Sequence, residues 1–223
     1  MKAMILAAGR GERMGTLTAI QPKPLLTIGA RTLIEHHVAR LVASGIDEIV
    51  INLSYRGTQV REHLGNGERF GVVIAYSEEG EPPLETLGGI VHALPLLGPE
   101  PFVLVNSDVF TDFDFRVLVA GPRVQTLVLV PNPTHNQNGD FGLDTAGFVS
   151  AAPPLRTYAG IAVFDPRAFA GLAPGRRQLK PWLDAAIARR ELRGHEFAGS
   201  WLDVGTPERL EQARAIATRA ARS

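Results

Sequence analysis

Short apolar runs, each followed by a segment of helical periodicity, are the feature that most constrains the fold. Four such runs and three intervening helical segments fill the first half of the chain: strands are expected at 3–8, 48–53, 72–76 and 101–106, and helices at 32–44, 58–64 and 90–97. Strands that alternate with helices pair in parallel, because each helix carries the chain back across the sheet. This half of the sequence therefore predicts a largely parallel sheet with helices on both faces.

The second half of the chain is less regular. Its expected elements are strands at 126–130 and 157–164, a hairpin over 140–150, a helix over 178–190, and a short strand at 201–204. A last helix begins at Thr206-Pro207-Glu208, which places an N-cap hydroxyl, a proline and an acid in the preferred order. No linker or repeat interrupts the sequence, so we expect one domain over residues 1–223.

Composition excludes several classes of protein. The 23 basic and 23 acidic residues balance, whereas nucleic-acid-binding proteins carry a basic excess or stripe. There is no cysteine, which rules out disulfides, thiolate metal sites and a cysteine nucleophile. No apolar run approaches the roughly 18 residues of a membrane span, and the N-terminal run is too short for a signal peptide. We expect a cytoplasmic protein without nucleic-acid or membrane partners.

A glycine loop, Gly9-Arg10-Gly11-Glu12-Arg13-Met14-Gly15, follows the first expected strand. Glycines at this position let backbone amides approach a phosphate closely. The loop lacks the Gly-Lys pair of a P-loop, and its third glycine comes one residue too late for a dinucleotide fingerprint. Arg10 and Arg13 suit a triphosphate, since guanidinium groups bind phosphate oxygens in pairs. An ordinary glycine-rich turn with solvated arginines remains the alternative.

Three further residues could act on such a phosphate. Lys23 stands between Pro22 and Pro24, which fix the backbone and hold the ammonium on a rigid support. Asp108 and Asp203 each leave an expected strand, and ligands of α/β sheets bind at the carboxyl ends of strands. Two carboxylates from distant segments could together hold one Mg²⁺ against phosphate oxygens.

The glycine loop and the Pro-Lys-Pro segment together resemble the signature of the sugar-1-phosphate nucleotidyltransferases, and the similarity runs across nearly the whole chain. Within that family the chain most resembles the N-acetylmuramate-1-phosphate uridylyltransferase branch, in the stretches 79–86, 106–112, 132–141 and 201–206. The resemblance implies an α/β fold: a Rossmann-like, GT-A-like three-layer α/β/α arrangement around a mixed, mostly parallel sheet, without a C-terminal β-helix.

The resemblance also implies a reaction and a site. A uridylyl group would pass from UTP to N-acetylmuramic acid α-1-phosphate, a step of peptidoglycan recycling, with Arg13 and Lys23 catalytic and Mg²⁺ held by Asp108 and Asp203. Nucleotide binding would involve eight residues: Leu6, Ala7, Ala8, Gly9, Gly11, Glu81, Gly88 and Asn106. Five residues would bind the sugar phosphate: Glu85, Thr86, Asp140, Gly160 and Lys180. The partners would be small-molecule substrates, and the protein a monomer or small homo-oligomer.

Alternatives stay open at this point. A carboxylate at Glu81 can accept the N3–H of uracil or two N–H groups of guanine, so residue chemistry does not fix the base. A mannose- or glucose-1-phosphate nucleotidyltransferase using GTP or dTTP is one alternative, and a non-catalytic nucleotide-sugar-binding subunit is another. Departures from the family pattern at Gly15-Thr16, Pro83 and Leu87 are expected to affect substrate fit more than chemistry.

Overall fold

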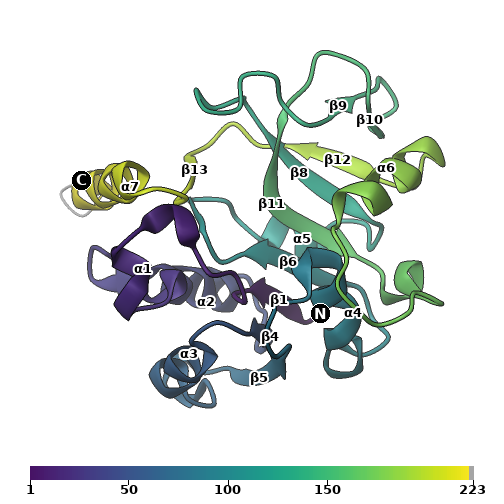
Figure 1. The fold of residues 1–223 in the computed structure, drawn as a ribbon. Coiled ribbons are helices and arrows are strands. Elements are labelled where there is room, and N and C mark those ends of the chain that lie inside the picture. The colour runs from purple at the N-terminus through teal and green to yellow at the C-terminus, as the bar shows by residue number, and fades with distance from the viewer. Residues whose placement is uncertain (221–223) are drawn as a thin grey trace.

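A mixed seven-stranded sheet forms the centre of the protein, as the computed structural model of residues 1–220 shows (Figure 1). Its strands, in spatial order, are β12 (Arg193–Glu196), β8 (Thr126–Val130), β11 (Thr157–Phe164), β6 (Phe102–Asn106), β1 (Ala3–Leu6), β4 (Glu48–Leu53) and β5 (Val73–Glu78). The four strands from β6 to β5 are parallel, while β11 runs antiparallel to both of its neighbours. The expected mixed, mostly parallel sheet is confirmed.

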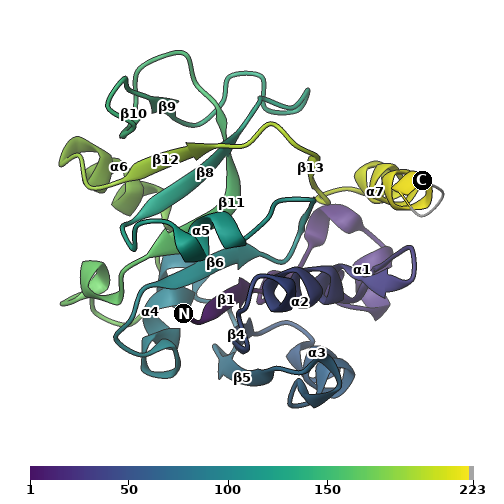
Figure 2. The same cartoon turned by 180° about the vertical axis from the view of Figure 1, so that it is seen from behind.

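Helices cover both faces of this sheet. They are α1 (Leu17–Ile20), α2 (Leu33–Ala43), α3 (Gly57–Leu64), α4 (Glu85–Leu97), α5 (Arg116–Ala120), α6 (Lys180–Ala188) and α7 (Pro207–Ala220), with single 3₁₀ turns at η1 (Glu12–Met14), η2 (Lys23–Leu25), η3 (Glu68–Phe70) and η4 (Pro166–Phe169). One core cluster packs α2, α3 and α5 against the sheet, and a second packs α4 and α6 against the opposite face. Figure 2, seen from behind, has α2 and α5 in front of the strands.

Alternation along the central strands explains this layering. Ala3 and Ile5 of β1 belong to the cluster under α2, whereas Met4 between them belongs to the cluster under α4. All three are fully buried, because successive strand residues point to opposite faces and both faces are covered. No helix within residues 1–220 is long and apolar enough to cross a bilayer.

Within residues 1–220, three short two-stranded pairs lie outside the main sheet. They are β2 (Thr27–Ile28) with β3 (Arg31–Thr32), β9 (Gly142–Leu143) with β10 (Val149–Ser150), and β7 (Val109–Thr111) with β13 (Trp201–Asp203). The β7–β13 pair brings the end of the chain back beside the segment that leaves β6. From there α7 packs on a third cluster that includes Met14 and Leu33, so the glycine loop and the C-terminal helix share a core.

The expected elements differ from the structure at two instructive places. Helix α4 begins at Glu85, five residues before the expected start, although Gly88 and Gly89 are poor helix formers. Both glycines are needed there: a Cβ on Gly88 would lie 2.4 Å from the carbonyl oxygen of Gly175, and one on Gly89 would lie 2.3 Å from the Glu79 carboxylate. Strand β12 was not expected, because its polar Arg-Gly-His-Glu sequence lies at the sheet edge.

Candidate active site

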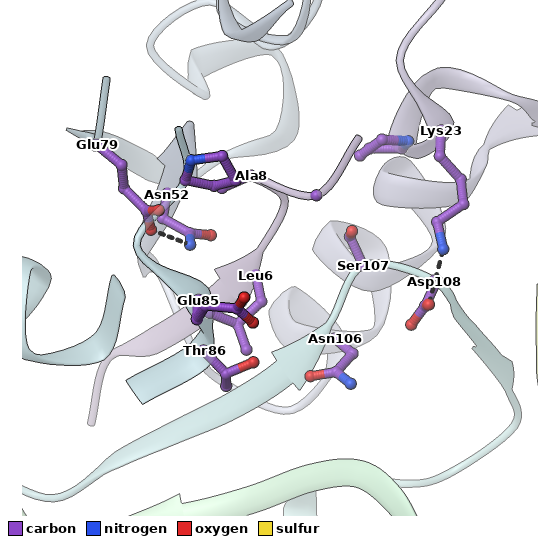
Figure 3. A pocket seen from close by; sticks show the side chains of 13 residues that line it. Leu6, Ala8, Lys23, Asn52, Glu79, Glu85, Thr86, Asn106, Ser107 and Asp108 are labelled. Atoms are coloured by element: carbon purple, nitrogen blue, oxygen red, sulfur yellow. Dashed lines mark hydrogen bonds and ion pairs between the residues drawn. The ribbon is translucent and has the colours of Figure 1, made fainter. Parts of the chain in front are cut away.

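Three strand ends meet at one edge of the sheet and begin the site. Leu6 at the end of β1 pairs with Asn52 of β4 on one side and with Asn106 of β6 on the other. A cavity opens over these residues, and we call it the central pocket (Figure 3). Its lining is Leu6, Ala8, Gly9, Lys23, Pro24, Asn52, Glu79, Pro83, Glu85, Thr86, Asn106, Ser107 and Asp108. Of the expected nucleotide and metal residues, five line this pocket at the carboxyl edge of the strands: Leu6, Ala8, Gly9, Asn106 and Asp108.

The glycine loop after β1 wraps around Lys23. Gly11 has a φ of 65°, and a Cβ there would lie 3.1 Å from Thr18 and 3.2 Å from the Lys23 side chain, so only glycine fits comfortably. Pro22 is extended, with φ −65° and ψ 145°, and Lys23 opens the 3₁₀ turn η2. This turn directs the Lys23 side chain into the central pocket.

Lys23 and Asp108 form the ion pair at the centre of the site. The Lys23 Nζ donates to Asp108 Oδ2 at 2.7 Å, and the two side chains are only 12% and 25% exposed (Figure 3). A charge-assisted bond in such a shielded place is stronger than one at the surface. Two residues predicted from separate motifs, 85 positions apart, are therefore in direct contact.

Asp203 lies next to Asp108 through the β7–β13 pair. It is paired with Val109 in register, and the Val204 amide donates to the Asp108 carbonyl oxygen at 2.7 Å. Asp203 Oδ1 lies 2.8 Å from Arg209 Nη1 and 2.8 Å from His135 Nε2. Neither Arg209 nor His135 was predicted, because their sequence positions show no pattern that points to Asp203.

The chemistry of these two acids fits a magnesium ion. One oxygen of each carboxylate is already bonded: Oδ2 of Asp108 to Lys23, and Oδ1 of Asp203 to Arg209 and His135. The other oxygen of each has no hydrogen-bond partner among residues 1–220. Within the same residues, no group of three or more acidic, histidine or cysteine side chains could enclose a metal. Mg²⁺ is typically held in this way, by one or two carboxylates together with phosphate oxygens and water.

A second cavity, the cationic pocket, adjoins the first and shares Lys23 with it. It is lined by Arg10, Gly11, Glu12, Arg13, Lys23, Pro82, Pro83, Arg176 and Gly205. Four of these side chains are cations, so the pocket suits a polyanionic ligand. Gly205 leaves room for two guanidinium groups, since a Cβ there would lie 2.3 Å from Arg209 and 3.2 Å from Arg13. Sequence reasoning found Arg10, Arg13 and Lys23, but it missed Arg176.

The acid that lines the central pocket is Glu79, and Glu81 lies elsewhere. Glu81 pairs with Arg10 at 3.0 Å, on the exposed side of the glycine loop. Glu79 Oε1 accepts from the Asn52 amide at 2.6 Å, and Oε2 accepts from the Leu84 amide at 2.8 Å. Asn52 is buried and also accepts from the Ala7 amide at 2.7 Å, so this network ties the start of the glycine loop to Glu79.

Two predicted site glycines allow neighbouring atoms to approach the backbone closely. Gly88 packs against residues 175–177, where its amide and that of Leu87 both donate to the Arg177 carbonyl oxygen. Gly160 has a φ of 69°, and a Cβ there would lie 2.7 Å from the Asn106 amide nitrogen. Within residues 1–220, neither glycine lines the central pocket, the cationic pocket or the cavity beside α6, so each acts by leaving room for the neighbouring atoms.

A third cavity, the α6 pocket, holds the remaining predicted sugar residues. It is lined by Glu85, Thr86, Asn106, Asp140, Phe141, Tyr158, Gln178, Leu179, Lys180 and Leu183, with a volume of about 370 Å³. It shares Glu85, Thr86 and Asn106 with the central pocket. Asp140 is already engaged, because its two oxygens accept from Asn136 and from the Tyr158 amide. Burial raises the pKa of the Tyr158 phenol, so this hydroxyl stays protonated at neutral pH.

Known proteins share much of this sequence. Residues 2–146 match the family model of the nucleotidyl transferases. The chain is 44% identical, over 97% of its length and 98% of the relative's, to N-acetylmuramate alpha-1-phosphate uridylyltransferase of Neisseria meningitidis. It is 30% identical to mannose-1-phosphate guanylyltransferase catalytic subunit beta of Drosophila pseudoobscura, over 93% of this chain and 60% of that one.

The fold is likewise shared with a solved structure. A crystal structure from Bacillus anthracis, assigned as a glucose-1-phosphate thymidylyltransferase and complexed with sucrose, superposes with a TM-score of 0.85. The alignment covers 97% of this chain and 95% of that one at 24% identity. At this identity the likeness concerns the fold, including the Rossmann-like layering expected from the sequence.

Proposed function

Because this chain belongs to the nucleotidyl transferase family, we propose that it transfers a uridylyl group from UTP to N-acetylmuramate α-1-phosphate and releases pyrophosphate. The observation that carries the proposal is the Lys23–Asp108 pair beside Asp203, with a cationic pocket on one side and the α6 pocket on the other. Such a site brings a nucleoside triphosphate and a sugar phosphate to the same two carboxylates.

In the proposed reaction, an oxygen of the sugar phosphate attacks the α-phosphorus of UTP. A bond forms between that oxygen and the α-phosphorus, the bond to the β-phosphate oxygen breaks, and pyrophosphate leaves. Displacement of this kind depends on positioning and charge neutralisation and needs no covalent enzyme intermediate.

The protein's own groups divide this work. Backbone amides of Gly9 to Arg13 and the Arg13 guanidinium hold the β- and γ-phosphates in the cationic pocket. Lys23 neutralises charge that develops around the α-phosphate, and Arg10 and Arg176 add positive charge to the pocket walls. Asp108 and Asp203 would hold Mg²⁺, which supplies Lewis-acid neutralisation of nucleotide oxygens when bound.

The uracil base belongs in the central pocket near Glu79. Both Glu79 oxygens already accept one protein hydrogen bond each, but a carboxylate oxygen can accept two. Glu79 can therefore accept the N3–H of uracil, and it can equally accept from guanine. Guanylyl transfer to mannose 1-phosphate is the second candidate, supported by this carboxylate and by the guanylyltransferase relative. A cytoplasmic location forms part of the proposal.

Pyrophosphate release tests the chemistry of the proposal. Lys23→Ala should lower kcat with UTP and N-acetylmuramate 1-phosphate about 10²–10³-fold, because it removes a preorganised charge that acts on the transition state. Asp203→Asn should cause a comparable loss, partly restored by a higher Mg²⁺ concentration. Lys2→Ala is the matched control, since Lys2 pairs with Glu48 away from the site and should leave kcat unchanged. Undiminished turnover in both site variants would refute the assigned roles.

A further inference from the structure

The α6 pocket contains one positive charge that the phosphate chemistry does not require. Lys180 lies at the first residue of α6, and its ammonium sits 5.1 Å from the centre of the Phe141 ring. Within residues 1–220, Lys180 is the only cationic side chain that lines this pocket. It is absent from the lining of the cationic pocket, where the triphosphate is placed.

Resting on the proposed function, we propose that Lys180 binds an acidic substituent of the sugar, the carboxylate of the lactyl ether of N-acetylmuramate, and does not bind the sugar phosphate. Lys180 would then determine the choice between acidic and neutral sugars. This assignment replaces the expectation, drawn from family resemblance, that Lys180 contacts the phosphate.

The arrangement of the pockets supports this role. The sugar phosphate must react close to Lys23 and Asp108, so the anomeric carbon faces the central pocket. The α6 pocket joins that region at Glu85, Thr86 and Asn106, and Lys180 lies outside this shared rim. The lactyl ether is attached at the third carbon of the sugar ring, well separated from the anomeric position. A sugar that enters with its phosphate at the rim therefore points the lactyl group into the α6 pocket.

The charges around Lys180 leave it available to a ligand. Its present partner is Asp184, one helical turn along α6, and the two side chains are 58% and 51% exposed. An exposed ion pair of this spacing contributes little to stability, so a carboxylate ligand can share Lys180 with Asp184 or displace Asp184. The two acids that line the same pocket are compensated: Glu85 pairs with Arg176 at 2.6 Å, and Asp140 accepts two hydrogen bonds.

Two sugars that differ only in the lactyl ether test the proposal. We would measure kcat/KM with UTP for N-acetylmuramate 1-phosphate and for N-acetylglucosamine 1-phosphate, using the latter as a competitive inhibitor if it is not turned over. Lys180→Met keeps the length of the side chain and removes its charge. It should lower kcat/KM for the muramate about tenfold, because an exposed charge-assisted hydrogen bond is lost, and leave the neutral sugar unaffected.

Two further variants sharpen the test. Asp184→Asn frees the Lys180 ammonium and should increase the preference for the muramate. Arg189→Met, at the other end of α6 and paired with Glu191, is the control and should change neither sugar.

An equal loss of kcat/KM for both sugars in Lys180→Met would show that Lys180 binds the phosphate. No loss for either sugar would also overturn the inference, and in both cases the proposed function would stand. If the wild-type protein does not use N-acetylmuramate 1-phosphate at all, the proposed function fails, and the inference fails with it.

Discussion

The hydrogen bonds of Asn52 and Glu79 beneath the central pocket should be broken by the single variant Asn52→Asp and restored when Glu79→Gln is added to it. In Asn52→Asp, the new carboxylate still accepts from the Ala7 amide, but it faces the Glu79 carboxylate where the Asn52 amide now donates at 2.6 Å. Asn52 is only 3% exposed, so solvent cannot screen the two charges well. The variant loses a charge-assisted hydrogen bond and gains a repulsion.

The magnitude follows from these contacts. A hydrogen bond to a charged group stabilises by about 1.5–3 kcal/mol, and two carboxylates that share a site relieve repulsion by raising the pKa of one of them. We expect Asn52→Asp to lose about 3 kcal/mol of unfolding free energy at pH 8. Because the folded pKa of the pair is raised above its unfolded value, the loss grows as pH rises through the folded pKa. It should shrink at pH 5, where the pair retains a proton.

The double variant Asn52→Asp, Glu79→Gln supplies the control. There the carboxamide introduced at position 79 would donate through its nitrogen to the carboxylate introduced at position 52. Its oxygen would accept from the Leu84 amide, so every bond of the network is made again. Urea denaturation at pH 8 and pH 5 measures each variant. The double variant should recover most of the wild-type stability at both pH values. If Asn52→Asp is as stable as wild type at pH 8, or the double variant is no more stable than the single one, the network does not act as described.

Three further predictions concern other buried groups. Arg209→Met should lower kcat and reduce the unfolding free energy by about 2 kcal/mol, because Arg209 is only 10% exposed and its loss leaves His135 as the partner of Asp203. Arg214→Met, at an exposed position of the same helix, should change neither kcat nor the unfolding free energy in turnover and denaturation assays. Burial lowers the pKa of His37 to about 4, so the imidazole takes up a proton more readily in the unfolded chain than in the folded one. Between pH 6.5 and pH 4 the unfolding free energy of wild type should therefore fall by about 3 kcal/mol more than that of His37→Leu. Parallel pH profiles of the two proteins would contradict this. Gly89→Ala places a methyl group 2.3 Å from the Glu79 carboxylate and should raise the Kd for UTP, measured by calorimetry, with Ala93→Gly on the same helix as the comparison.

Much of the fold could be predicted from apolar patterning. The strands 48–53, 126–130 and 157–164 were expected with the bounds that β4, β8 and β11 have, because buried strands in a covered sheet are continuous apolar runs. The start of α4 and strand β12 could not be predicted in this way. The glycines of α4 are required by close contacts with atoms that are distant in the sequence, which no local pattern shows. Strand β12 lies at the edge of the sheet, where apolar residues are not required.

The candidate site divides along the same line. Asp108 and Asp203 could be found because each leaves a strand at its carboxyl end, and Lys23 could be found because two prolines flank it. The contacts of Arg209 and His135 with Asp203 depend on how α7 and the loop before β9 pack, and no local pattern encodes that packing. Glu79 and Glu81 are two residues apart, and only the network with Asn52 shows which of them lines the pocket.

The most direct test of the proposed function is a comparison of two substrate pairs in one pyrophosphate-release assay. We predict that kcat/KM with UTP and N-acetylmuramate 1-phosphate exceeds that with GTP and mannose 1-phosphate by about 100-fold or more, because the second pair differs from the first in both base and sugar and each mismatch lowers kcat/KM. Detection of the uridine diphosphate sugar by mass spectrometry would identify the product. Faster turnover with GTP and mannose 1-phosphate would contradict the proposed uridylyl transfer.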